Sequence, residues 1–294
     1  MASIQSRLFT LFLRLVDKKS FLKRRLDKGS PNYFSCPQPP AKFFAGDIIE
    51  KFRINISDVF TIRSRAANNR KHILYLHGGA YVQSFSRPHW SFLADILKTT
   101  GCTVTAPDYP LAPSYTYVDS FDMVLRLYRQ LMQTNDAKNL ILMGDSAGGG
   151  FALALAQRLR EEHLPQPGQI ILLSPWLDIT LRNQSIKSID RIDPFLGIEG
   201  LLEAGKQYAG SASPDNYLLS PVYGSLKGLG KIFVFAGSNE ILVADTRKLK
   251  SLAAIQQVEI AYYEYPDMFH AWMLLNLPES KKAKQQLAAL INSY

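Results

Sequence analysis

Short apolar runs alternate with amphipathic segments over most of this 294-residue chain. A run of four to six apolar residues is typical of a buried strand, whereas apolar residues at spacings of three and four are typical of a helix. The pattern predicts strands at 73–76, 102–106, 140–143, 170–173, 232–236 and 258–263. It predicts helices at 90–98, 120–132, 148–160, 246–256 and 281–291. Strands that alternate with helices form a mostly parallel sheet with helices on both faces, so we expect an α/β fold.

The segment before these units has a different pattern, which predicts a hairpin at the edge of the sheet. Between residues 50 and 63, Phe52, Ile54 and Ile56 occupy every second position. Such alternation is typical of a half-buried strand. We predict Ser57 and Asp58 as the turn of this hairpin.

The N-terminal segment predicts an amphipathic helix followed by a connector over residues 31–45, which are rich in proline and aromatic side chains. One face of a helix over residues 4–22 is apolar, with Ile4, Leu8, Leu11, Leu15 and Leu22 in line. We expect this face to pack on the body of the protein. The alternatives are a lid over an apolar pocket and a helix that lies on a membrane surface.

A second irregular segment, from about residue 179 to residue 215, contains no predicted strand. An insertion at this point lies near the loop ends of the sheet. Together with residues 1–45 it predicts a cap. The rest of the chain, 46–178 and 216–294, then forms the two parts of the core.

The charge of the chain adds a question about partners. The 34 basic and 25 acidic side chains give a formal net charge of +9, and eight of the basic residues lie within residues 1–30. A basic excess is found in proteins that bind nucleic acids or membrane surfaces. No nucleic-acid motif accompanies it, so we expect no nucleic-acid partner. Weak membrane contact through the basic N-terminal helix stays a hypothesis, and the sequence leaves a monomer and a dimer open.

Cysteine content and hydropathy bear on location. Cys36 and Cys102 are too few for a disulfide scaffold, and we predict that both are free. No apolar run has the length that spans a bilayer. Residues 8–16, which contain Arg14, lack the small-residue cleavage site of a signal peptide. We therefore expect a cytoplasmic protein.

The strongest chemical signal is the run Gly144-Asp145-Ser146-Ala147-Gly148, which lies between a predicted strand and a predicted helix. In this context G-x-S-x-G forms a tight turn that exposes the serine hydroxyl. Side chains two positions before and after Ser146 would collide with the neighbouring strand and helix, and glycine removes that collision. The turn also places the N–H of Ala147 at a helix start, where it faces developing negative charge.

A second glycine-containing loop, His77-Gly78-Gly79-Ala80, follows the predicted strand at 73–76. Consecutive glycines let the backbone approach a ligand so closely that its N–H groups point at an oxyanion. We predict Gly78, Gly79 and Ala80 as oxyanion donors together with Ala147. His77 is predicted to brace the loop.

A serine hydroxyl needs a general base, and the base needs an acid to orient it. We predict His270 as the base, because it follows a late strand at the edge where ligands bind in open parallel sheets. The acid is expected between the serine and the histidine in chain order. Glu240, on the loop after the strand at 232–236, is the preferred acid and would hold the tautomer of His270. Asp245 is the alternative acid, although capping the next helix would be a sufficient role for it.

These motifs resemble those of the hormone-sensitive-lipase-like esterases of the α/β-hydrolase superfamily, over about residues 70–275. Residues 144–149 match the G-D-S-A-G-G motif of that family in full, and residues 77–80 resemble its H-G-G-G motif, with Ala80 in place of the third glycine. Residues 108–113 are similar to its D-Y-R-L-A-P segment, with Pro110 in place of arginine. The usual acid of the family is an aspartate in D-x-L, whereas Glu240 stands at that position here.

The resemblance implies an α/β-hydrolase fold with a helical cap and a serine carboxylesterase or lipase without metal or organic cofactor. The implied substrates are small-molecule esters with short to medium acyl chains, cleaved through an acyl-enzyme. As walls of the substrate pocket we predict Tyr81, His89, Phe195, Leu196 and Tyr208. An amidase or deacetylase with the same triad is an alternative, and so is a hydrolase-fold binding protein without catalysis.

Overall fold

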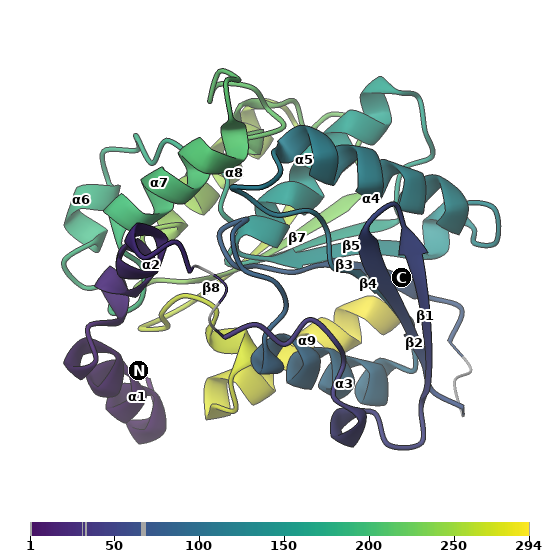
Figure 1. The fold of residues 1–294 in the computed structure, drawn as a ribbon, viewed down its shortest axis with the longest axis horizontal. Coiled ribbons are helices and arrows are strands. Elements are labelled where there is room, and N and C mark those ends of the chain that lie inside the picture. The colour runs from purple at the N-terminus through teal and green to yellow at the C-terminus, as the bar shows by residue number, and fades with distance from the viewer. Residues whose placement is uncertain (1, 31, 33, 66–68, 294) are drawn as a thin grey trace.

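In the computed structural model, which describes residues 2–30, 32, 34–65 and 69–293, one eight-stranded sheet runs through the protein (Figure 1). The strands are β1 (Ile48–Ile54), β2 (Ser57–Arg63), β3 (His72–Leu76), β4 (Thr103–Pro107), β5 (Leu140–Asp145), β6 (Gln169–Leu173), β7 (Lys231–Gly237) and β8 (Ile260–Tyr265). Their order in the sheet is β1-β2-β4-β3-β5-β6-β7-β8. All neighbours from β4 to β8 are parallel, and β2 is antiparallel to both of its neighbours. The prediction of a mostly parallel sheet is confirmed.

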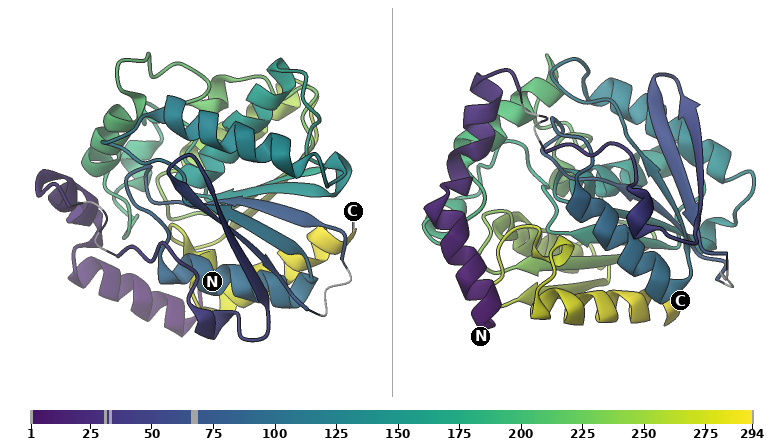
Figure 2. Two further views of the ribbon diagram at one scale, coloured as in Figure 1. Left: turned by 45° about the vertical axis from the view of Figure 1, so that its right-hand side comes forward. Right: turned by 60° about the horizontal axis from the view of Figure 1, so that its bottom comes forward.

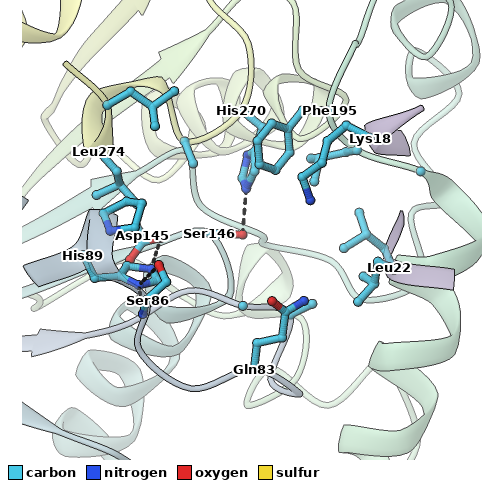
Figure 3. A pocket seen from close by; sticks show the side chains of 18 of the residues that line it. Lys18, Leu22, Gln83, Ser86, His89, Asp145, Ser146, Phe195, His270 and Leu274 are labelled. Carbon is cyan, nitrogen blue, oxygen red and sulfur yellow. Dashed lines mark hydrogen bonds and ion pairs between the residues drawn. The ribbon is translucent and has the colours of Figure 1, made fainter. Parts of the chain in front are cut away.

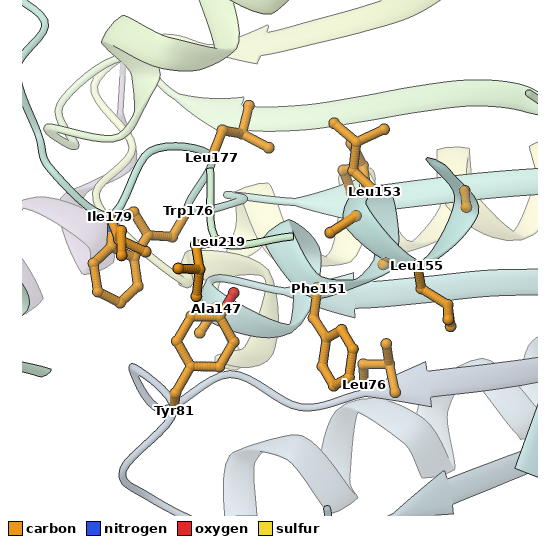
Figure 4. Close-up of a cluster of buried hydrophobic side chains, with 14 of the residues drawn as sticks. Leu76, Tyr81, Ala147, Phe151, Leu153, Leu155, Trp176, Leu177, Ile179 and Leu219 are labelled. Carbon is orange, nitrogen blue, oxygen red and sulfur yellow. The ribbon is translucent and has the colours of Figure 1, made fainter. Parts of the chain in front are cut away.

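Helices cover both faces of the sheet, as predicted (Figure 1). One face carries α4 (Tyr117–Leu131), α5 (Ala147–Glu161) and α8 (Val243–Ile255), and the other carries α3 (Arg87–Thr100) and α9 (Pro278–Ser293). Each face buries its own apolar cluster. Figure 4 shows the first cluster, in which Phe151 and Leu153 of α5 pack beside the sheet. Because β5 and β6 are buried on both faces, their sequences read as continuous apolar runs.

The predicted hairpin forms at the edge of the sheet, but its turn is displaced. Ile54 pairs with Ser57, so Asn55 and Ile56 make the turn, and the prediction of Ser57 and Asp58 as the turn is wrong. The φ angle of Asn55 is 54°. Asparagine accepts this left-handed conformation more readily than most residues, which explains why the chain reverses there.

The N-terminal segment forms two helices, α1 (Ile4–Leu15) and α2 (Lys18–Asp27), where a single helix over residues 4–22 was expected. The chain changes direction at Asp17, whose φ angle is 47°. A short polar side chain tolerates this conformation because it can bond locally. Here the Asp17 carboxylate accepts a hydrogen bond from Ser20 and pairs with Arg24.

The apolar face of α1 points to solvent, so the prediction that it packs on the body is wrong. Ser6, Phe9 and Leu13 hold the opposite face: Ser6 donates to Glu279, Phe9 stacks on Phe269, and Leu13 is buried. The apolar residues of the outer face are 52–77% exposed: Ile4, Leu8, Leu11 and Leu15. Figure 2 shows α1 at the periphery of the molecule.

The second helix, α2, packs against the other predicted cap segment. Residues 179–215 contain α6 (Ile186–Ile189) and α7 (Ile198–Ala209), and α2 lies along α7 (Figure 2). Glycines make this close approach possible. A Cβ atom on Gly197 would lie 2.3 Å from the carbonyl oxygen of Lys19, and one on Gly200 would lie 2.9 Å from the nitrogen of Lys23. The two segments therefore meet backbone to backbone.

No helix among the described residues is both long and apolar enough to span a membrane. No group of three histidine, cysteine, aspartate or glutamate residues in that part of the chain is arranged to hold a metal ion. Cys36 and Cys102 are both free, as predicted.

Candidate active site

Ser146 lies on the tight turn between β5 and α5, with φ 52° and ψ −121°, a strained conformation for a residue with a side chain. Its N–H donates to the carbonyl of Leu173, and its carbonyl accepts from the N–H of Trp176. A Cβ atom on Gly144 would lie 2.2 Å from the carbonyl oxygen of Gly148, and one on Gly148 would lie 2.0 Å from a carbonyl of β3. The geometry thus agrees with the predicted need for glycine on both sides of the serine.

Three buried side chains from three loops meet at this turn. The Ser146 Oγ lies 2.8 Å from Nε2 of His270, and Nδ1 of His270 lies 2.6 Å from Oε2 of Glu240. The other carboxylate oxygen of Glu240 accepts the N–H of Gly237 at 2.8 Å. Figure 3 shows the imidazole directed at Ser146. With a proton on Nδ1 that is donated to Glu240, Nε2 is free to accept the proton of the serine hydroxyl.

Asp245, the alternative acid, is held elsewhere. It is the third residue of α8, whose N-cap is Leu242, so its predicted capping position is wrong. Its Oδ1 accepts from Nδ2 of Asn183 at 2.9 Å, and no described group bonds its Oδ2. Burial, followed by the nearby charge of Asp178, raises the pKa of Asp245 to about 6. Of the two predicted acids, the structure brings Glu240 to the histidine.

We expect Asp245→Asn to stabilise the protein at pH 8. Because the pKa of Asp245 is raised on folding, the free energy of unfolding falls as the pH rises from about 4 to about 6 and stays low above that. Asparagine keeps the contact with Asn183 and carries no charge, so the variant should gain about 1–3 kcal/mol at pH 8 and little at pH 4. Urea unfolding at both pH values measures this difference. Asp122→Asn, on an exposed position of α4, is the control, and equal stability of Asp245→Asn and wild type at pH 8 would contradict the prediction.

The loop after β3 lies beside the serine. Gly79, Ala80 and Tyr81 all have positive φ angles, of 119°, 55° and 61°. Gly79 and Ala80 line the cavity beside Ser146. Among the described residues, no acceptor bonds their N–H groups or that of Ala147. These three amides are therefore available to a negatively charged oxygen.

The fourth predicted donor, Gly78, is not available. Its N–H donates to Oδ1 of Asp145 at 2.9 Å, so the prediction of Gly78 as an oxyanion donor is wrong. The same oxygen accepts from the hydroxyl of Tyr75, and Nε2 of His89 lies 3.4 Å from the other carboxylate oxygen. Burial alone would raise the pKa of Asp145, but the charge of His89 and these hydrogen bonds lower it below its usual value. Asp145 therefore connects the turn that carries Ser146 to the loop after β3 through a hydrogen bond.

A cavity of about 190 Å³ opens beside Ser146, between the core and the N-terminal helices (Figure 3). Its walls include three of the predicted pocket residues: His89, Phe195 and Leu196. Other wall residues were not predicted: Lys18, Leu22, Gln83, Ser86, Leu274 and Leu275. Lys18 and Leu22 come from α2, so the first thirty residues complete the pocket.

Tyr81 and Tyr208 do not line this cavity, and their prediction as pocket walls is wrong. Their rings stack on each other with centroids 3.7 Å apart, and Trp176 stacks on Tyr81 at 5.7 Å. Both tyrosines are buried in the apolar cluster of Figure 4, which shows Tyr81 close to Trp176. Tyr81 belongs to the loop after β3 but packs as a core residue, because stacking buries most of the area of a large planar ring.

Asp193 is a site residue that the sequence analysis missed. Its Oδ1 accepts the N–H groups of Phe195 and Leu196, at 2.7 and 3.0 Å, and its Oδ2 accepts the N–H of Ile241 at 2.8 Å. Burial raises the pKa of this carboxyl to about 6. Asp193 therefore connects the pocket residues Phe195 and Leu196 to the loop that carries Glu240 by hydrogen bonds. No spacing in the sequence points to this role, because all its partners are backbone amides.

Comparisons with known proteins extend these observations. A family model described as the alpha/beta hydrolase fold matches residues 73–274. An esterase of Acinetobacter venetianus is 32% identical over 225 residues, which cover 75% of this chain and 74% of that protein. The solved structure of an esterase from the bacterial hormone-sensitive lipase family is 31% identical, covers 85% of both chains and has a TM-score of 0.79. The structure of EstE5 soaked with p-nitrophenyl butyrate is 27% identical, covers 99% of both chains and has a TM-score of 0.86.

Proposed function

This chain belongs to the α/β-hydrolase family, as a carboxylic ester hydrolase of the hormone-sensitive-lipase-like group, and we propose that it cleaves short- to medium-chain acyl esters with Ser146 as nucleophile. The observation that carries the proposal is the pair of hydrogen bonds that connects Ser146 to His270 and His270 to Glu240. This arrangement is the one that activates a serine hydroxyl at neutral pH. The relatives that are esterases support the choice of an ester as substrate.

The proposed mechanism follows from the contacts of each group. His270 takes the proton of the Ser146 hydroxyl as its oxygen attacks the ester carbonyl, and Glu240 stabilises the imidazolium that forms. The carbonyl oxygen becomes negative and accepts hydrogen bonds from the N–H groups of Gly79, Ala80 and Ala147. His270 then gives the proton to the leaving alcohol, which departs from the acyl-enzyme. Water, activated by the same imidazole, releases the carboxylic acid.

The size of the cavity supports short acyl groups. Its volume of about 190 Å³ holds about six groups of water size, which is the scale of a butyryl or hexanoyl group. Phe195, Leu196 and Leu274 give it apolar walls. Residues 1–45 and 179–215 then serve as a cap that limits chain length, because α2 and α7 close one side of the pocket.

We expect nitrophenyl esters to be cleaved with a maximum of kcat/KM between acetate and hexanoate and a fall of at least about tenfold at decanoate. A fluorophosphonate probe should label the wild-type chain once, at Ser146. A chain that is labelled but cleaves nitroanilides faster than nitrophenyl esters would favour the amidase alternative. A chain that neither cleaves any ester nor reacts with the probe would contradict the proposed function and favour a binding protein.

We further propose that α1 rests on an anionic lipid surface. Its outward apolar face is solvent-exposed over four leucine and isoleucine positions, and Arg7 and Arg14 are exposed beside it. The next helix, α2, carries further basic residues, including Lys23, Arg24 and Arg25. An apolar face bordered by basic side chains is typical of a helix that lies in the headgroup region of a bilayer.

Co-sedimentation with vesicles tests this lipid contact. The full chain should sediment with vesicles that contain phosphatidylglycerol and remain in solution with phosphatidylcholine alone. The triple variant Leu8→Ser/Leu11→Ser/Leu15→Ser should lose at least about tenfold in binding without loss of esterase activity, because these side chains are exposed. The proposed lipid contact is contradicted if the wild-type chain sediments with neither kind of vesicle. It is also contradicted if the chain forms a dimer in solution that the triple variant abolishes.

A further inference from the structure

One cation in the substrate pocket, Lys18, has no carboxylate partner among the described residues. Lys18, the first residue of α2, lies in the pocket wall, and Figure 3 shows its amino group directed into the cavity between Phe195 and Leu22. The ammonium lies 4.5 Å from the ring centroid of Phe195 and 4.6 Å from that of Phe21. Among the residues that the structure describes, no carboxylate and no hydrogen-bond acceptor contacts it.

Other cations of α2 differ from Lys18 in this respect. Three of them pair with carboxylates: Lys19 with Asp190, Lys23 with Asp27 and Arg24 with Asp17. In the described lining of the pocket the acidic side chain is Asp145. Its carboxylate is already bound by the donors named above, and Figure 3 shows Asp145 and Lys18 on opposite sides of Ser146. The part of the chain that the structure describes therefore supplies no anion to Lys18.

The described residues around Lys18 supply no hydrogen-bond acceptor to its ammonium group. Removal from water lowers the pKa of Lys18 to about 8, which leaves most of the group charged at neutral pH. The two aromatic faces attract a cation. They offer no acceptor to its three N–H donors, and unpaired donors away from water are unfavourable. A carboxylate that enters the pocket would supply both the charge and the acceptors.

The position of Lys18 relative to the reacting groups is set by the fold. The ring of Phe195, which the ammonium contacts, lies 5.6 Å from the imidazole of His270. The start of α2 is fixed, because the backbone at Lys19 lies directly against Gly197. The 4.5 Å from the ammonium to the Phe195 ring and the 5.6 Å from that ring to the imidazole together place the ammonium no farther than about 10 Å from the centre of the His270 imidazole, which a substrate of moderate length can span.

We propose that Lys18 is a specificity-determining residue, and that the preferred substrates are esters that carry an ionised carboxylate a few bonds from the ester group. The proposal rests on the proposed esterase function. The carboxylate can belong to the acyl part or to the alcohol part of the ester. Two matched substrate pairs separate these sources, each with a charged member and a neutral one: methyl hydrogen adipate with dimethyl adipate, and 4-acetoxybenzoate with its methyl ester.

The wild-type enzyme should cleave the charged member of at least one pair with a kcat/KM about tenfold higher or more. Lys18→Met should lower kcat/KM for the charged ester about 10- to 50-fold and change the neutral ester less than about threefold. Lys18→Arg keeps the charge and should retain most of the preference. Lys23→Met removes a cation of the same helix that pairs with Asp27. This variant should leave kcat/KM unchanged for both the charged and the neutral ester.

Equal rates on charged and neutral esters in the wild type would overturn the role of Lys18 and leave the esterase proposal intact. A charge preference that survives in Lys18→Met would do the same. If the neutral esters are not cleaved and the fluorophosphonate probe does not react, the proposed function itself fails. Thermal unfolding checks that the variants fold, and should Lys18→Met not fold, the wild-type ratio and Lys18→Gln decide the question.

Discussion

Ser146→Ala is expected to lower kcat for nitrophenyl butyrate by about 10⁴- to 10⁶-fold, with little change in KM. The hydroxyl forms the bond to the acyl group, and alanine has no atom that can replace it. The amides of Gly79, Ala80 and Ala147 remain in place, so a small rate above the uncatalysed reaction should persist. Alanine also fits the strained turn without a new collision, because the Cβ atom of Ser146 is already accommodated there.

The measurement needs a purified variant and two readouts, because traces of a foreign esterase would mimic residual activity. Steady-state hydrolysis gives the loss in kcat, and labelling by a fluorophosphonate probe reports the nucleophile directly. Ser188→Ala, at an exposed position of α6, is a matched control that should retain full activity and labelling. Retention of more than about 1% of kcat, or labelling at another residue, would remove Ser146 from its proposed role.

Glu240→Gln is expected to lower kcat by about 10³- to 10⁴-fold, because the amide can reverse the tautomer of His270. In the native protein Nδ1 of His270 donates to the Glu240 carboxylate. The amide nitrogen of glutamine can instead donate to Nδ1, which moves the imidazole proton to Nε2 and turns it toward the serine. The base then has no lone pair for the Ser146 hydroxyl. Loss of the negative charge also leaves the imidazolium unstabilised.

Asp245→Asn is the matched control for Glu240→Gln, since both variants exchange a buried carboxylate for an amide after β7. It should keep kcat within about threefold of the wild type, because Asp245 bonds Asn183 and does not contact the imidazole. Glu240→Asp should fall between the two, since it restores the charge on a shorter side chain. A larger loss from Asp245→Asn than from Glu240→Gln would make Asp245 the acid.

The elements and the serine turn could be predicted from sequence because their causes are local. A strand buried on both faces needs a continuous apolar run, and the turn at Ser146 needs glycine at both flanks because backbone atoms occupy the space of a side chain. The positions of the acid and the base could be predicted because loops at the carboxyl ends of parallel strands meet at one edge of the sheet. These features depend on neighbours in sequence or on the chirality of parallel strands.

The predictions that the structure contradicts depend on contacts between segments that lie far apart in the sequence. The orientation of α1 depends on Glu279 and Phe269, which lie at the other end of the chain, and they hold the less apolar face of the helix. Gly78 is excluded as an oxyanion donor because Asp145 accepts its N–H. Lys18 enters the pocket because α2 packs on glycines of α7. The spacing of apolar residues along a helix does not show which of its faces will contact residues that are distant in the sequence.

The separation of the site residues along the chain bears on how activity arises during translation. Strands β7 and β8, near the end of the chain, present Glu240 and His270, whereas Ser146 follows a central strand made much earlier. A ribosome-bound chain that stops short of residue 270 contains the proposed nucleophile, Ser146, without the proposed base. Such a polypeptide lacks both the proposed base and its hydrogen bond to the acid, so the proposed hydrolysis requires a chain that extends past residue 270.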